Sequence, residues 1–96
     1  MALKVAQEAE KRLGELEGVF RERLLGDPEL LASLPERFVL VVMPLDEPEA
    51  MRVALEGLSR ARTWEGEGPL VYALFQGGGL LALVLPEGRL LPARAA

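Results

Sequence analysis

The longest unbroken apolar run lies near the middle of the chain, where positions 38–43 are all apolar. A strand with one face in solvent alternates apolar and polar residues, so this run predicts a strand over residues 37–43 that is buried on both faces. Two further apolar runs, 70–75 and 80–85, are joined by Gln76 and three glycines. Glycine adopts the positive φ angles that tight hairpins need, so these runs predict an antiparallel pair of strands.

Apolar residues also recur every three or four positions in two long segments, which predicts amphipathic helices over residues 3–25 and 47–62. Opposite charges at helical spacing lie on the polar side of both segments. They predict ion pairs along the first helix, namely Glu8 with Arg12, Lys11 with Glu15 and Glu17 with Arg21. In the second long helix they predict a ladder of alternating charge that runs through Glu49, Arg52, Glu56 and Arg60.

Three short sequences indicate where elements begin and end. Gly26-Asp27-Pro28 joins a helix-stopping glycine to a preferred N-cap and a preferred first helical residue, which predicts a short helix over 28–34. Asp46 and Glu49 have the spacing of a capping box, in which the N-cap carboxylate accepts the N3 amide. Pro86-Glu87-Gly88 fits a type I turn with a left-handed glycine, which predicts a fourth strand over 89–91.

These elements predict one domain over residues 1–96, with residues 93–96 as a disordered tail. The fold class is α+β, or small α/β. We expect a two-layer sandwich of two long helices, one short helix and a mixed sheet of three or four strands, in the order α-α-β-α-β-β(-β). Two long helices leave apolar strand surface uncovered, so we expect a second chain to cover it, including the second face of residues 38–43.

Composition narrows the chemistry that this domain can perform. Cysteine and histidine are absent, which excludes disulfides and thiolate nucleophiles and removes the commonest general base. Fifteen acidic residues against eleven basic residues give a net charge of -4, which opposes binding to nucleic acid or to an anionic membrane. Residues 68–86 carry no charge, but the three glycines within them argue against a transmembrane helix. Abundant Glu and Arg with few amides are typical of a thermophile or of a GC-rich genome.

Two groups of polar residues are candidate functional sites, and each group can also be explained by an ordinary structural role. Asp46, Glu47 and Glu49 are candidate ligands of a divalent cation or of a small molecule, and candidate groups of a carboxylate-based enzyme, although helix capping uses the same residues. Arg60, Arg62 and Trp64 combine positive charge with an aromatic ring, as sites for single-stranded nucleic acid do. Nearby glutamates favour ordinary ion pairing instead.

The segment from Leu70 to Leu85, two apolar strands around a glycine-rich turn, resembles the closing β-hairpin of roadblock-type dimerisation domains. The resemblance covers about a sixth of the chain, and the preceding order of elements differs from that family. It implies a dimerising module without catalytic activity.

The sequence therefore predicts a small, non-catalytic, cytoplasmic protein that acts as a homo-oligomerising module, most simply a dimer, or binds another protein. We expect no catalytic residue, no cofactor, no membrane and no nucleic-acid partner. The candidates for the shared surface are apolar residues of the strands and the first helix: Val39, Val41, Leu81, Leu83, Phe20 and Leu24.

Overall fold

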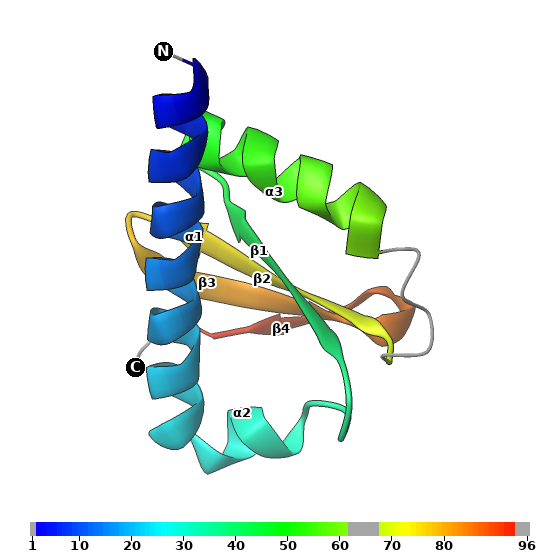
Figure 1. The fold of residues 1–96 in the computed structure, drawn as a ribbon. Coiled ribbons are helices and arrows are strands. Elements are labelled where there is room, and N and C mark those ends of the chain that lie inside the picture. Colours follow the sequence, from blue (N-terminus) through cyan, green and yellow to red (C-terminus); the bar gives the residue numbers. More distant parts are fainter. Residues whose placement is uncertain (1, 62–67, 94–96) are drawn as a thin grey trace.

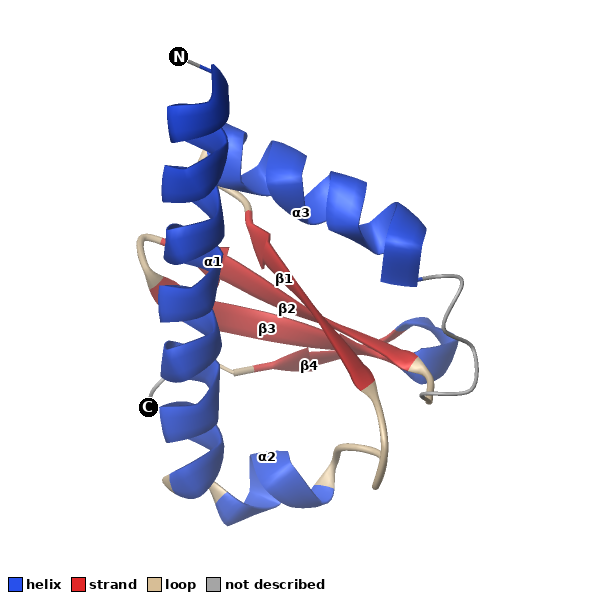
Figure 2. Ribbon diagram, in the orientation of Figure 1, coloured by secondary structure: helices blue, strands red, loops and turns tan. Residues whose placement is uncertain are grey.

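The computed structural model describes residues 2–61 and 68–93, and the side chains of residues 7–59 and 68–93. Figures 1 and 2 show an α+β fold in which helices pack against one mixed sheet, as the sequence predicts. The elements in chain order are α1 (Ala2–Leu25), α2 (Pro28–Ala32), β1 (Val39–Pro44), α3 (Pro48–Ala61), β2 (Leu70–Gln76), β3 (Gly79–Leu85), a 3-10 turn (Pro86–Gly88) and β4 (Arg89–Pro92).

The four strands lie in the order β1-β2-β3-β4. β1 and β2 are parallel and are joined through α3, whereas β2, β3 and β4 form an antiparallel meander. The hairpin between β2 and β3 turns on Gly77 and Gly78, whose φ angles of 62° and 80° match the two-residue turn that suits the twist of paired strands. The predicted mixed sheet with an antiparallel hairpin is therefore confirmed.

The register divides the sheet into two faces, because successive side chains of a strand point in opposite directions. One face, which we call the inner face, carries Val42, Val71, Ala73, Phe75 and Leu83 and contributes most of the core. Helix α1 covers it with Leu16 and Phe20, and in Figure 1 this helix crosses in front of the strands. The Phe20 ring also meets Phe38 edge-on, with the ring centroids 6.5 Å apart.

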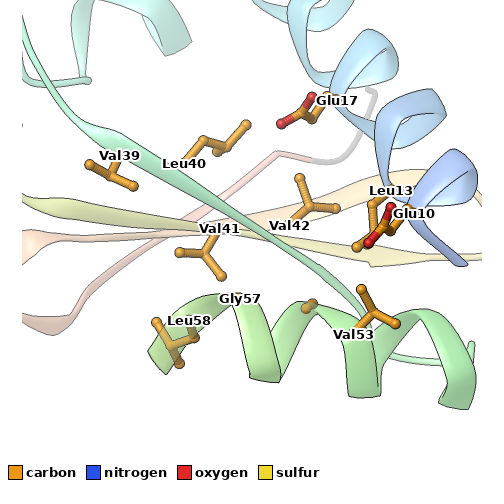
Figure 3. A pocket seen from close by; sticks show the side chains of 11 residues that line it. Glu10, Leu13, Glu17, Val39, Leu40, Val41, Val42, Val53, Gly57 and Leu58 are labelled. Carbon is orange, nitrogen blue, oxygen red and sulfur yellow. The ribbon is translucent and has the colours of Figure 1, made fainter. Parts of the chain in front are cut away.

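Helix α3 lies beside β1, on the other side of that strand from α1. Figure 3 shows Leu40 and Val42 directed toward α1, and Val41 directed toward α3. Val41 is only 6% exposed. The sequence predicts that another chain covers the second side of β1. At Val41, a helix of the same chain packs against that side instead.

Two local predictions are wrong. Asp46 does not cap α3, because that helix begins at Pro48 and the Asp46 carboxylate instead accepts a hydrogen bond from the backbone N–H of Gly77. The turn after β3 is not of type I, since Glu87 has a φ of 71° and Gly88 a φ of 76°.

Two other local predictions are confirmed. The short helix α2 is capped as expected, with the Asp27 carboxylate accepting from the backbone N–H of Leu30 at 3.1 Å. On α1, Glu17 and Arg21 form the predicted ion pair, with their charged groups 3.8 Å apart.

Within the described residues, none of the helices combines the length and the apolarity that crossing a bilayer requires.

Candidate interaction surface

The face of the sheet opposite the core is apolar across all four strands. We call it the outer face. Because paired residues share a face, the register aligns these side chains in two rows that carry no charged residue. The rows are Val41, Tyr72, Val84 and Leu90, and Met43, Leu74, Ala82 and Pro92.

In the row that contains Tyr72, burial of the outer face decreases from β1 toward β4, whereas in the other row Ala82 of β3 is as buried as Met43 of β1. Val41 and Met43 are buried, Tyr72, Leu74 and Val84 are half-buried, and Leu90 is 59% exposed. Among the described residues, α3 packs mainly against α1 and β1, so this helix covers little of the other three strands. A continuous apolar surface, the outer apolar face, therefore remains accessible at Tyr72, Leu74, Val84 and Leu90.

The six predicted interface residues fall into two groups: four pack within the single chain, and two are partly exposed. Phe20 and Leu83 belong to the core of the single chain, Leu24 packs against that core, and Val41 is buried beside α3. Of the remaining two, Val39 is half-buried and Leu81 is 41% exposed. Leu81 is the extra residue of a β-bulge, since Leu74 pairs with Ala82 and Phe75 pairs with Leu80. Neither Val39 nor Leu81 is among the four residues that define the outer apolar face.

Sequence reasoning did not identify Tyr72, Val84 and Leu90 as surface residues. The signal that separates an inner face from an outer face is alternation of polar and apolar residues, and β2 and β3 are almost entirely apolar. Only the position of α1 shows which of their two faces is covered.

The three candidate metal ligands point to three different partners. Asp46 Oδ2 accepts from the backbone N–H of Gly77 at 2.9 Å. Glu47 accepts two hydrogen bonds from Arg12, and Glu49 lies 3.4 Å from Arg52. Within the described part of the chain, no three acidic side chains gather in a way that would hold a metal ion.

These contacts instead form a polar corner where α1, the start of α3 and the β2–β3 turn meet. Arg12 donates from Nε to Glu47 Oε1 at 2.8 Å and from Nη2 to Glu47 Oε2 at 3.0 Å. Hydrogen bonding to Glu47 raises the pKa of Arg12 above its ordinary value, so the guanidinium stays charged. The expected pair of Arg12 with Glu8 is replaced by the contacts with Glu47 and Glu15. The corner fastens three segments, and the carboxylates of Asp46 and Glu47 both accept hydrogen bonds from groups of the same chain there.

A groove of about 300 Å³ opens between α1 and α3, along β1 (Figure 3). We call it the β1 groove. Its floor is four consecutive residues of β1, 39–42. Helix α3 provides Val53, Ala54, Gly57 and Leu58, and α1 provides Glu10, Leu13 and Glu17. The two glutamates are the charged residues of this lining, which is otherwise apolar.

The candidate nucleic-acid residues cannot be placed together. Arg62 and Trp64 lie outside the described residues, and the side chain of Arg60 is likewise not described.

Comparisons with known proteins agree with this α+β domain without assigning it an activity. The chain is similar to a hypothetical protein from Thermus thermophilus, TTHC002, which has a crystal structure. The two sequences are 39% identical, and the two structures superpose with a TM-score of 0.64. The match covers 80% of this chain and 94% of that one. No curated protein matches the chain. Residues 8–88 match the model of a family of unknown function, DUF5647. The chain therefore belongs to the DUF5647 family.

Proposed function

We propose that the protein is a non-catalytic module that forms a homodimer through the outer apolar face. The observation that carries this proposal is the pair of uncharged rows that cross the sheet, with Tyr72, Leu74 and Val84 half-buried and Leu90 exposed. A monomer rarely leaves a contiguous apolar surface of this kind in water. A cytoplasmic location, expected from the sequence, stays a prediction.

A second copy of the same chain is the partner that fits this surface best. A two-fold axis through the middle of the face places the same apolar rows against each other, which is the self-complementary arrangement of most homodimers. Two sheets packed in this way also bury side chains from both facing surfaces at the usual spacing of a β-sandwich. No ion pair has to be matched across the contact, because the two rows carry no charge.

The experiment compares the wild type with Tyr72→Glu by light scattering after gel filtration. We expect a dimer for the wild type and a folded monomer for the variant, because the substitution places one carboxylate per chain in the centre of the contact. The melting temperature of the wild type should rise with protein concentration, whereas that of the variant should not.

Leu55→Glu is the matched control, because Leu55 is 49% exposed on α3, outside the outer apolar face. It introduces the same charge and should leave the dimer intact. A wild type that stays monomeric at high concentration, or a Tyr72→Glu variant that still forms a dimer, would overturn the proposal.

A further inference from the structure

The free edge of β1 lies at the β1 groove. Among the strands that the structure describes, β1 is at the edge of the sheet and pairs with β2 alone. The backbone N–H of Val39 donates to Pro69, and that of Leu45 donates to Phe75. Backbone groups of a strand alternate in direction, so the odd-numbered residues of β1 bond to β2 and the N–H and C=O groups of Leu40 and Val42 point to the unpaired edge.

The groove gives access to this edge and not to a face of the sheet. Four consecutive residues of β1 line it, although their side chains point alternately toward α1 and toward α3 (Figure 3). A hollow over one face would touch only every second residue. The space between the helices therefore lies in line with the sheet, where a fifth strand would continue it.

We propose that the β1 groove binds an extended, basic peptide segment of another protein, which adds to the edge of β1 as a strand. Its main chain exchanges hydrogen bonds with Leu40 and Val42, and its side chains alternate between the two helices. This is the β-augmentation mode of peptide recognition, in which the main chain supplies affinity and pockets for alternate side chains supply specificity.

The two walls of the groove determine which side chains the peptide carries. The α1 wall presents Glu10 and Glu17, two turns apart and thus about 10 Å along the helix. The α3 wall includes Ala54 and Gly57, and a Cβ added at Gly57 would meet no other atom within 4 Å. We infer Lys or Arg at the positions that face α1, and apolar side chains at the positions that face α3.

A second copy of this chain does not suit the groove. Its β1 would bring its own α1 and α3 into a hollow of about 300 Å³, and its Glu10 and Glu17 would meet the same charges. A small apolar molecule would leave the outward backbone groups of Leu40 and Val42 without partners, which a peptide strand provides.

The test uses a fluorescently labelled, end-capped octapeptide of alternating lysine and valine, with binding measured by anisotropy and by amide chemical shifts. We expect binding that weakens with salt, and the largest shifts at Leu40 and Val42. The same peptide N-methylated at alternate amides, on the edge that meets β1, should bind about tenfold more weakly, because it loses the ladder hydrogen bonds. An octapeptide of alternating glutamate and valine should not bind.

Two variants locate the site. Gly57→Leu should weaken binding at least about tenfold by filling the groove, whereas Gly14→Leu, an equally open glycine on α1 that does not line the groove, should not. Glu10→Gln with Glu17→Gln should weaken it about two- to fivefold. Tyr72→Glu should bind as the wild type does, which separates this proposal from dimerisation.

Three results would overturn the proposal. They are the absence of wild-type binding at low salt, equal affinity for the N-methylated peptide, and equal affinity of a folded Gly57→Leu variant.

Discussion

Arg12 and Glu47, 35 residues apart in the chain, are joined by two parallel hydrogen bonds of 2.8 and 3.0 Å. The pair connects α1 to the residue just before α3. Both side chains are about one-third exposed, so solvent screens part of the attraction. The two-pronged geometry is what distinguishes this pair from the single contacts elsewhere on the helices.

We predict that a double-mutant cycle on Arg12→Ala and Glu47→Ala gives a coupling free energy of about 1 kcal/mol, measured by urea unfolding. Arg12→Lys should not restore the wild-type stability, because an ammonium cannot make two parallel bonds to one carboxylate. The exposed pair of Arg52 and Glu56, with a single bond of 2.7 Å, is the control and should couple by a few tenths of a kcal/mol. Equal coupling in the two cycles would contradict the role given to the two-pronged geometry.

A second prediction concerns Asp46, whose carboxylate accepts from the β2–β3 turn at Gly77. Asp46→Ala should lower the free energy of unfolding by about 1 kcal/mol, because the turn loses a charge-assisted hydrogen bond. Asp46→Asn should lose less, since its amide oxygen still accepts. Millimolar Mg²⁺ should shift the melting temperatures of the wild type and Asp46→Asn equally. A shift confined to the wild type would restore the metal hypothesis.

Glu87 provides a stabilising substitution. It has a φ of 71°, a left-handed conformation that costs a residue with a Cβ about 1–2 kcal/mol. Glu87→Asn should therefore raise the free energy of unfolding by about 0.5–1 kcal/mol, because asparagine tolerates this conformation better. Gly88→Ala, at the neighbouring φ of 76°, should have the opposite effect. Thermal melts of the three proteins decide the sign, and a destabilised Glu87→Asn would show that the Glu87 side chain contributes more than its backbone strain costs.

Gly68 is the position where a methyl group should do most harm. Its φ is 118°, and an added Cβ would lie 2.8 Å from the backbone oxygen of Arg37, just before β1. Backbone atoms cannot move aside as a flexible side chain does, so Gly68→Ala should cost about 2–4 kcal/mol in denaturant unfolding. Gly18→Ala, within α1 and with no atom within 4 Å of the added Cβ, should instead stabilise by about 0.5–1 kcal/mol. A loss of stability of the same size in both variants would mean that Gly68 has no special constraint.

Most of the secondary structure follows from short-range patterns. The helical periodicity, the Gly26-Asp27-Pro28 punctuation and the glycines at 77 and 78 each act within a few residues, so the elements and the hairpin are predictable. The wrong predictions involve competition between near and distant partners. Asp46 has a plausible cap three residues away but bonds to Gly77, which lies 31 residues further along the chain.

The candidate surfaces depend on how helices and strands that are distant in the sequence pack together, which no short stretch of sequence shows. The apolar strands alone determined that this protein would build a buried sheet and would have more apolar strand surface than its helices can cover. Only the tertiary structure decided which surface that is, because α1 and α3 hold opposite sides of β1 and leave Tyr72, Val84 and Leu90 accessible. The physical reason is that a face is buried only when another element packs on it. The sequence of a strand that is apolar on both faces does not indicate which face its neighbours will cover.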